Sequence, residues 1–406
     1  MENGTRKEIE GGNMNTIYLD HSATTPVDPE VLGAMMRYFG NHFGNPSSIH
    51  GFGRGAKKAI EAARGQVAAL IGADPAEIVF TGGGTEADNI ALMGAAFAEM
   101  SGKNHIITSA IEHHAILNTC KYLETRGFKV TYLPVDAQGV VNPEDVQKAI
   151  TDKTFLISIM HANNEIGTIE PIPEIGYMAH QQGILMHTDA VQTVGKIPVR
   201  VDDLNVDLLS LAAHKFYGPK GTGSLYIKKK TPMNPILFGG HQEGGRRTGT
   251  ENVPGIVGLG KACEVAARDL PFQMDRLNTL RNSLEKQMTE KIPNLLINGH
   301  PFWKLPHILS ISFPSISGEF IVRELDKRGI AASPGAACTA DTITVSHVMA
   351  ALNVSKDFAM GTVRFSLGKG NREEEITHTA EVLTEIVQKL KGMAELEAAV
   401  GMRGCR

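Results

Sequence analysis

The chain has 406 residues, of which 42% are hydrophobic, and this is enough for a large core and two domains. Its charges are mixed and sum to −4, which argues against general binding to nucleic acid or to a membrane surface. No apolar run approaches a membrane span, and the first residues lack the apolar core of a signal peptide. Four widely spaced cysteines without a CxxC pair fit a reducing cytosol, so we expect a cytoplasmic protein without a metal site.

The first well-marked element is a helix that ends just before residue 72. Ala56, Ile60, Ala63 and Val67 recur every three or four positions and give this segment one apolar face. Gly72 follows, at a position where glycine often closes a helix. The spacing therefore predicts an amphipathic helix packed on a core.

Beyond this helix, short apolar or β-prone runs alternate with helical patterns. Such an alternation predicts a largely parallel sheet covered by helices on both faces. We therefore expect an α/β fold with a mostly parallel, doubly wound sheet. The expected strands are residues 78–81, 105–108, 154–160, 184–188, 208–211 and 224–227.

The character of the chain changes around Cys263. A long helical pattern is followed by a strand-like run at 307–313 and then by amphipathic helices. We expect these parts to form a second, smaller α/β domain, which the N-terminal arm joins. The expected ranges are 1–24 for the arm, 25–265 for the large domain and 266–406 for the small domain.

Two expected strand ends carry residues suited to chemistry. Gly82, Gly83, Gly84 and Thr85 form a glycine-rich turn before a helix, where unpaired N–H groups and the helix dipole favour a phosphate. The stretch SLAAHKFYGPKGTG (210–223) places Lys215 just past another strand. A lysine that is partly desolvated there can act as a Schiff-base nucleophile. Each feature alone also fits an ordinary loop.

Further motifs make the chemistry more specific. Together with residues 210–223, they resemble the cysteine desulfurases of the NifS/IscS type over residues 17–390. These enzymes belong to the class V aminotransferase superfamily and have the fold-type I of pyridoxal phosphate (PLP) enzymes. The motifs are SAIEHHAIL (109–117), HANNEIGT (161–168), HTDAVQTVGK (187–196), GGHQEGGRRTGTEN (239–252), AASPGAACTADTITVSHVMAAL (331–352) and GTVRFSLG (361–368).

The resemblance implies that PLP is the cofactor and that Lys215 holds it as a Schiff base. Asp189 matches the carboxylate that pairs with the pyridinium nitrogen, and Gln192 matches the residue at the phenolic oxygen. His113 matches a histidine that stacks on the ring and acts as acid and base, as its near-neutral pKa allows. From local sequence alone, Asp189 fits a helix N-cap equally well, and His114 competes with His113.

The resemblance also implies a phosphate site that is shared between subunits. Gly84, Thr85, His214 and Thr250 match residues at the phosphate. The family carries the threonine that Thr250 matches on a loop that enters the neighbouring subunit. We therefore expect a homodimer with a shared active site.

The substrate residues implied by the resemblance are Asn164, Arg364 and Cys338. Asn164 matches an asparagine near the substrate carboxylate, and Arg364 matches the arginine that clamps this carboxylate. Cys338 matches the nucleophile, with the spacing of the longer-loop branch. The implied reaction converts L-cysteine to L-alanine and leaves the sulfur on Cys338 as a persulfide. An iron–sulfur scaffold or another acceptor, such as a tRNA-thiolation relay, would then receive the sulfur. Motif support is absent for Cys120, Cys263 and Cys405.

Some positions depart from the family pattern. Ala212 replaces a serine that would bind the phosphate, so we expect weaker retention of PLP. Pro334 and Ala336 replace two serines in the cysteine loop. The alternative functions are a selenocysteine lyase, a class V aminotransferase and a non-catalytic scaffold, of which the last should have lost Lys215 or Asp189.

Overall fold

The computed structural model describes residues 16–339 and 342–403, and it describes residues 336–339, 342–344 and 393–403 by their backbone alone. The chain divides into two compact units. Unit 1 comprises residues up to 21, 276–298 and from 307 onward, and unit 2 comprises residues 22–275 and 299–306. The domain ranges expected from the sequence stay predictions, because compactness does not show which segments fold independently.

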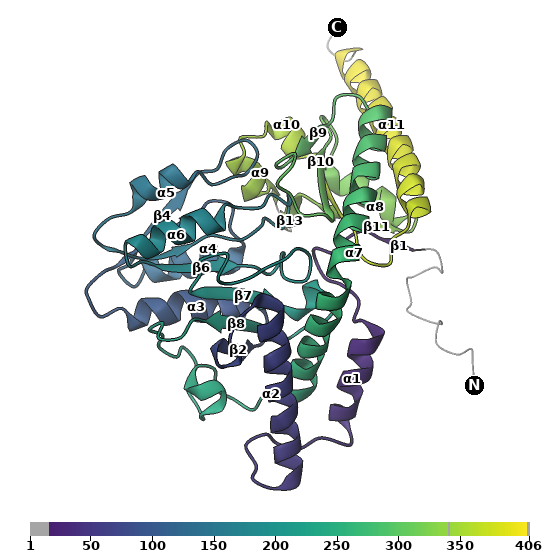
Figure 1. Ribbon diagram of the computed structural model, residues 1–406. Coiled ribbons are helices and arrows are strands. Elements are labelled where there is room, and N and C mark those ends of the chain that lie inside the picture. Colours follow the sequence, from purple (N-terminus) through teal and green to yellow (C-terminus); the bar gives the residue numbers. More distant parts are fainter. Residues whose placement is uncertain (1–15, 340–341, 404–406) are drawn as a thin grey trace, which may run out of the picture. The chain divides into compact units, whose positions relative to one another are not determined.

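Unit 2 is built on a seven-stranded sheet with the order β2-β8-β7-β6-β5-β3-β4 (Figure 1). The strands from β7 to β4 are parallel neighbours, whereas β8 pairs antiparallel with both β7 and β2. β2 therefore points the same way as the parallel strands. The strands are β2 (Ile78–Thr81), β3 (His105–Ser109), β4 (Lys129–Leu133), β5 (Thr154–Ser158), β6 (Leu185–Asp189), β7 (Leu208–Ala212) and β8 (Gly223–Ile227).

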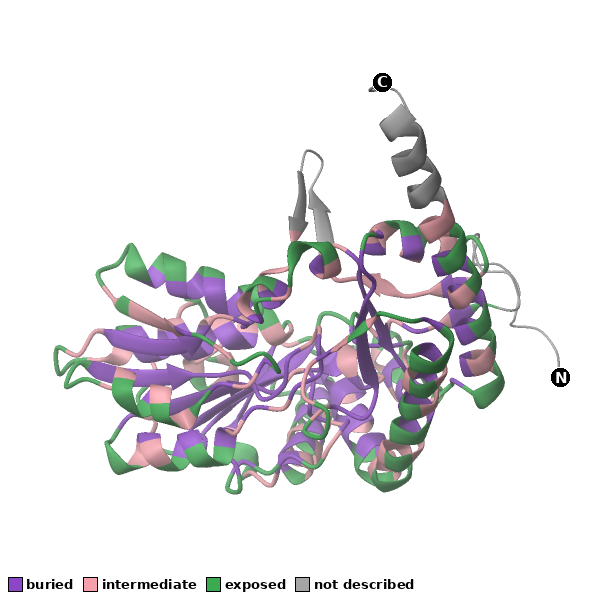
Figure 2. Ribbon diagram, turned by 90° about the horizontal axis from the view of Figure 1, so that it is seen from above, coloured by how far each residue is buried: buried purple, intermediate pink, exposed green. Residues whose placement is uncertain are grey.

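Both faces of this sheet are buried, as Figure 2 shows by the purple colour of the central strands. Successive residues of one strand point to opposite faces, so Ile106 and Ile107 of β3 enter two different apolar clusters. The cluster of Ile107 includes residues of α2 (Gly51–Ile71), α6 (Ile172–Gln181) and α7 (Val253–Lys291), and that of Ile106 includes α3 (Gly84–Ala98) and α4 (His114–Glu124). The expected doubly wound α/β fold is confirmed.

The first predicted helix is α2, and its end is the one expected. Its buried residues include Ala56, Ile60, Ala63 and Val67. Gly72 adopts φ +71° and ψ 32°, and its N–H donates to the carbonyl of Ala68. Glycine is favoured here because it takes the left-handed conformation without the steric cost of a side chain.

The sequence analysis missed β4. Its residues Lys129, Val130, Thr131 and Tyr132 are exposed or half-buried, and only Leu133 is buried. An edge strand buries fewer side chains than a central one, so it lacks the continuous apolar run that marked the others.

Unit 1 has its own core and a four-stranded antiparallel sheet, in the order β12-β15-β10-β9. A second pairing joins β1 to β11 in parallel and brings the N-terminal segment into this unit. A hairpin of β13 and β14 contains Cys338. The strands are β1 (Ile17–Tyr18), β9 (Leu296–Asn298), β10 (Ile308–Ser312), β11 (Ile330–Ala331), β12 (Ser333–Pro334), β13 (Ala336–Thr339), β14 (Thr342–Val345) and β15 (Thr362–Ser366).

The remaining helices complete the two units. Unit 1 contains α8 (Gly318–Asp326), α9 (His347–Ala351), α10 (Lys356–Ala359) and α11 (Glu373–Arg403), and unit 2 contains α1 (Pro29–Phe39) and α5 (Pro143–Ala149). The unit boundary falls inside α7, between Asp275 and Arg276. Within the described ranges, no helix has the length and apolar character needed to cross a bilayer.

Candidate functional site

Five of the strands in unit 2 that point in one direction, β2, β3, β5, β6 and β7, deliver the candidate residues at their carboxyl ends. Open α/β sheets bind their ligands at this edge. Residues far apart in sequence are therefore brought to one side of the sheet. Gly84 and Thr85 follow β2, His113 follows β3, Asn164 follows β5, Asp189 is the last residue of β6, and His214 and Lys215 follow β7.

Lys215 ends a short 3-10 turn, Ala213–Lys215, directly after β7. Its Nζ donates to the carbonyl oxygens of Ser22 at 2.6 Å and Ala23 at 2.9 Å. The Ser22 carbonyl also accepts from Nε2 of Gln192 at 3.1 Å. One backbone carbonyl thus links the predicted Schiff-base lysine to the predicted ring-binding glutamine.

The glycine turn faces a cavity of about 840 Å³. The lining includes residues 82–85, Thr24, His214 and Lys220. Nδ1 of His214 lies 3.1 Å from Oγ1 of Thr24. Burial, with a contribution from nearby lysine charges, lowers the pKa of His214 to about 4, so this ring is neutral near pH 7. The wall offers backbone N–H groups, a hydroxyl and a lysine, which suits an anion.

Close packing holds the glycine turn over β7. A side chain at Gly84 would place its Cβ 2.7 Å from Cγ2 of Val191 and 3.6 Å from Cβ of Ala212. Ala212 is buried beneath this turn. Glu86 accepts from the Gly82 N–H at 2.9 Å, so that donor is already used inside the protein.

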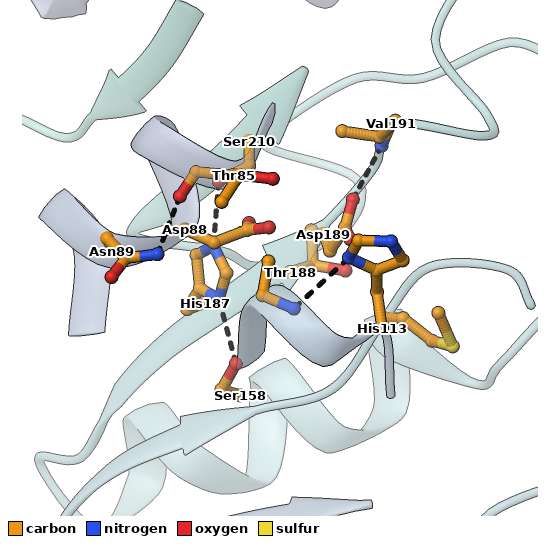
Figure 3. Close-up of polar contacts among 12 residues, drawn as sticks. Thr85, Asp88, Asn89, His113, Ser158, His187, Thr188, Asp189, Val191 and Ser210 are labelled. Carbon is orange, nitrogen blue, oxygen red and sulfur yellow. Dashed lines mark hydrogen bonds and ion pairs between the residues drawn. The ribbon is translucent and has the colours of Figure 1, made fainter. Parts of the chain in front are cut away.

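Asp189 is buried at the end of β6 and lies beside His113 (Figure 3). Its carboxylate accepts from the Val191 N–H at 2.9 Å. Burial raises the pKa of Asp189, whereas this hydrogen bond and the charges of His113 and Lys215 oppose the rise. The Asp189 carboxylate is therefore suited to pair with a positively charged ring nitrogen.

His113 caps α4, and its Nδ1 accepts from the Ala115 N–H at 3.2 Å. In the neutral ring the proton therefore sits on Nε2. Both His113 and His114 are exposed, but His113 is the one whose charge acts on Asp189. The geometry favours His113 as the ring that serves this site.

Asn164 lies in the loop after β5, and the side chain of its neighbour Asn163 holds this loop in place. The side chain of Asn163 is fully buried and donates to the carbonyl of Ile111 at 3.0 Å. Its Oδ1 accepts from the N–H groups of Glu165 and Ile166. Asn163 therefore holds the loop, and the neighbouring Asn164 is half-buried.

Arg364, in unit 1, lies at the centre of β15 (Thr362–Ser366) and not at an end of the strand. The residue is buried, and its Nη2 contacts Oδ1 of Asp20 at 2.7 Å. A guanidinium has five N–H donors in a planar fork, a geometry that suits carboxylates. A buried guanidinium is costly without a counter-charge, and Asp20 provides one for Arg364. The sequence pattern did not indicate this ion pair.

Two further residues predicted for the site are Cys338 and Thr250. The backbone of Cys338 belongs to β13, where it pairs with Ile343, but its side chain lies outside the described residues. Thr250 is exposed, five residues after the 3-10 turn Gln242–Gly245. Cys405 also lies outside the described residues.

The other two cysteines are buried in unit 2. Burial raises the pKa of Cys120 to about 12 and also raises that of Cys263. Both thiols therefore stay protonated and unreactive near pH 7. In the described part of the chain, no group of three or more His, Cys, Asp or Glu side chains could hold a metal ion.

Comparison with known proteins places the chain in a family. The model of the aminotransferase class-V family matches residues 17–378. A protein named cysteine desulfurase IscS from Dictyoglomus turgidum is 50% identical over 92% of this chain and 95% of that protein. The chain belongs to the cysteine desulfurases of the class-V aminotransferase family.

Other members of this family are similar over most of their length. The cysteine desulfurase IscS of Methanosarcina thermophila is 50% identical over 95% of this chain and 96% of its own. A solved NifS-like protein has a TM-score of 0.87 and 41% identity, covering 92% of this chain and all of that one. A structure of SspA in complex with cysteine has a TM-score of 0.75 and 40% identity, over 87% and 99% of the two chains.

Sequence reasoning missed the residues that the N-terminal segment contributes to the candidate site. Ser22 and Ala23 offer only backbone carbonyls to Lys215, so their side chains carry no signal. Thr24, which meets His214, follows directly in the run HSATTP. A hydroxyl in a polar loop is too common to be singled out without the fold.

Proposed function

We propose that this chain is a PLP-dependent cysteine desulfurase that converts L-cysteine to L-alanine and keeps the sulfur on Cys338 as a persulfide. The observation that carries the proposal is the meeting of Lys215, Asp189 and the glycine turn at one edge of a single sheet. The names of the relatives, cysteine desulfurase IscS, support the reaction, and the SspA complex supports cysteine as the substrate.

The residues present fit PLP. The cavity at Gly82–Thr85, Thr24 and His214 has donors for a phosphate, and a Cβ at Gly84 would collide with Val191. Asp189 would hold the ring nitrogen, and Gln192 would reach the phenolic oxygen. When bound, PLP supplies an aldehyde that links to amines and a conjugated ring that takes up electrons from the substrate.

Lys215 would hold the aldehyde carbon and then move the Cα proton. The carbonyls of Ser22 and Ala23 orient the Lys215 amine, and they would do so whenever this amine is not bound to the aldehyde. Near neutral pH the unprotonated His214 would accept or donate a hydrogen bond without adding charge. His113, whose neutral ring carries its proton on Nε2, would assist the proton transfers to and from the substrate.

The sulfur step needs an acceptor thiolate. The Cys338 thiolate would attack the substrate sulfur, so that an S–S bond forms while the C–S bond breaks. The electron pair of the C–S bond stays with carbon, which then takes a proton to give alanine. Arg364 and Asn164 would bind the substrate carboxylate during this step.

The proposal also covers assembly and destination. We propose a homodimer in which Thr250 reaches the neighbouring subunit's phosphate site. The persulfide would pass to a cytoplasmic acceptor protein, either an iron–sulfur scaffold or a tRNA-thiolation relay.

The test is to add L-cysteine to the PLP-loaded protein and to measure alanine and sulfide together, with dithiothreitol present. We expect the two products in equal amounts. L-selenocysteine in a parallel sample tests the selenocysteine lyase, which would use it far faster than L-cysteine. Transfer of the amino group to a keto acid, without sulfide, would instead indicate an aminotransferase.

Ala212→Ser is expected to slow the loss of PLP on dialysis. The residue lies beneath Gly84, so a serine hydroxyl there is close to the proposed phosphate. A charge-assisted hydrogen bond is worth about 1.5–3 kcal/mol, which corresponds to roughly a tenfold or larger change in retention. Unchanged or faster loss would mean that the hydroxyl points away from the phosphate.

Gly84→Ala is expected to weaken PLP binding at least about tenfold, because the new methyl group pushes Val191 away from its bond to Asp189. Fluorescence titration of the apoprotein with PLP measures this. The matched control is Gly65→Ala, in the exterior of α2 with nothing within 4 Å of the new Cβ. The control should gain about 0.5–1 kcal/mol of stability and bind PLP normally. Equal PLP affinity in both variants would contradict the proposed phosphate site.

A further inference from the structure

A buried polar row lies beside Asp189 and has no part in the function described so far (Figure 3). Nδ1 of His187 meets Oγ of Ser158 at 2.8 Å, and its Nε2 meets Oγ of Ser210 at 3.1 Å. These residues come from the neighbouring strands β5, β6 and β7, and all three are fully buried. Asp88 of α3 covers the end of the row and hydrogen-bonds with Ser210.

Asp88 is poorly placed to carry a negative charge. It is 1% exposed, and within the described residues its Oδ1 has no hydrogen-bond partner. The nearest ring nitrogen, Nε2 of His187, is 3.8 Å away. Burial lowers the pKa of His187 to about 3, so this ring is neutral and provides no counter-charge. An ionised carboxylate without a cation in such a place is costly.

Asp189 is better placed to hold a charge than Asp88. It has the Val191 N–H at 2.9 Å and faces the positive charges of His113 and Lys215. Burial and the nearby Asp189 raise the pKa of Asp88 well above its ordinary value. Two buried carboxyl groups that repel each other do not both ionise, so the negative charge goes to Asp189, which faces His113 and Lys215, and the proton stays on Asp88.

A third buried carboxyl group, Glu112, belongs to the same region. Its Oε1 accepts from the Ser109 hydroxyl at 2.6 Å and from the Met160 N–H at 2.9 Å. Burial nevertheless raises the pKa of Glu112 to about 8. The charged and titratable groups that face Asp88 are thus Asp189, Glu112 and the neutral His187.

We propose that Asp88 is a positioning residue for Asp189: buried and hydrogen-bonded with Ser210, it keeps its proton, so that Asp189 carries the negative charge opposite the cofactor ring. The role at the ring rests on the proposed function. The proton on Asp88 does not, because it follows from burial and contacts within this chain. A neutral Asp88 exerts no charge repulsion on Asp189. An ionised Asp88 would raise the pKa of Asp189 further and favour its protonation.

The decisive measurement is infrared spectroscopy of the apoprotein at pH 7. We expect a carbonyl band of a protonated carboxylic acid that shifts in D₂O and disappears in Asp88→Asn. Glu112→Gln and Glu170→Gln identify the bands of the other buried acids; Glu170 is a matched control, since it is 2% exposed and its pKa is raised to about 8. Identical bands in the wild type and Asp88→Asn would overturn the proposal. This result needs no turnover, so it is distinguishable from a failed L-cysteine assay.

A second arm tests the role at the cofactor. Asp88→Asn replaces one neutral group with another, so the pH midpoint of the bound PLP absorbance should stay unchanged. Removal of an ionised group would shift it by about one unit or more, which would contradict the proposal. Asp88→Val loses the bond to Ser210, worth about 1 kcal/mol, and should release PLP about fivefold faster, while Asn restores retention. If the valine variant does not fold, the asparagine variant still decides the outcome in both arms.

Discussion

Replacing Lys215 with alanine is expected to abolish covalent retention of PLP and to reduce alanine production by about a thousandfold or more. The variant lacks both the amine that holds the aldehyde carbon and the base that moves the Cα proton, and proton transfer alone contributes about 10²–10⁴-fold. Borohydride treatment of the PLP-loaded protein, followed by peptide mapping, should find the cofactor on Lys215 in the wild type and on no peptide in the variant.

Two other lysines make this prediction easy to contradict. Lys220 lines the cavity at the glycine turn, and Lys196 is buried with a pKa that burial and the charge of Lys215 lower to about 7. An amine with a lowered pKa can also react with an aldehyde. A borohydride adduct on either residue in the wild type would remove Lys215 from its proposed role. Lys220→Ala is the control, and it should weaken binding of PLP without preventing its covalent attachment.

Cys338→Ser should leave PLP binding intact but should lower sulfide and alanine production by orders of magnitude. A thiol of ordinary pKa, near 8.5, is a few per cent ionised at pH 7, whereas a serine hydroxyl is not ionised and is a poor acceptor of sulfur. After incubation with ³⁵S-labelled L-cysteine, the wild-type protein should carry label that dithiothreitol removes. The variant should carry none.

The buried cysteines provide the matched controls. Cys120→Ala and Cys263→Ala remove thiols whose pKa burial raises, so label and turnover should persist as long as these variants fold. Near-normal alanine production by Cys338→Ser, in the absence of dithiothreitol, would exclude the persulfide mechanism. Label that moves to Cys120 or Cys263 would identify a different acceptor.

The sequence by itself determined the features that depend on local pattern. The apolar stripe of α2 and the glycine at 72 fixed a helix and its end, since both reflect periodicity and backbone sterics. Continuous apolar runs located the central strands because parallel strands are buried on both faces. Lys215 and the turn at Gly84 were found for the same reason, as each follows such a run directly.

Only the tertiary structure decided which distant groups meet. The carbonyls of Ser22 and Ala23 hold Lys215, and Asp20 pairs with Arg364, through contacts between segments separated by almost 200 residues or more. The proton proposed for Asp88 depends on the same kind of information. A carboxyl group in an alanine-rich helix gives no hint of its charge, because that charge is set by burial and by the strands β6 and β7 that surround it.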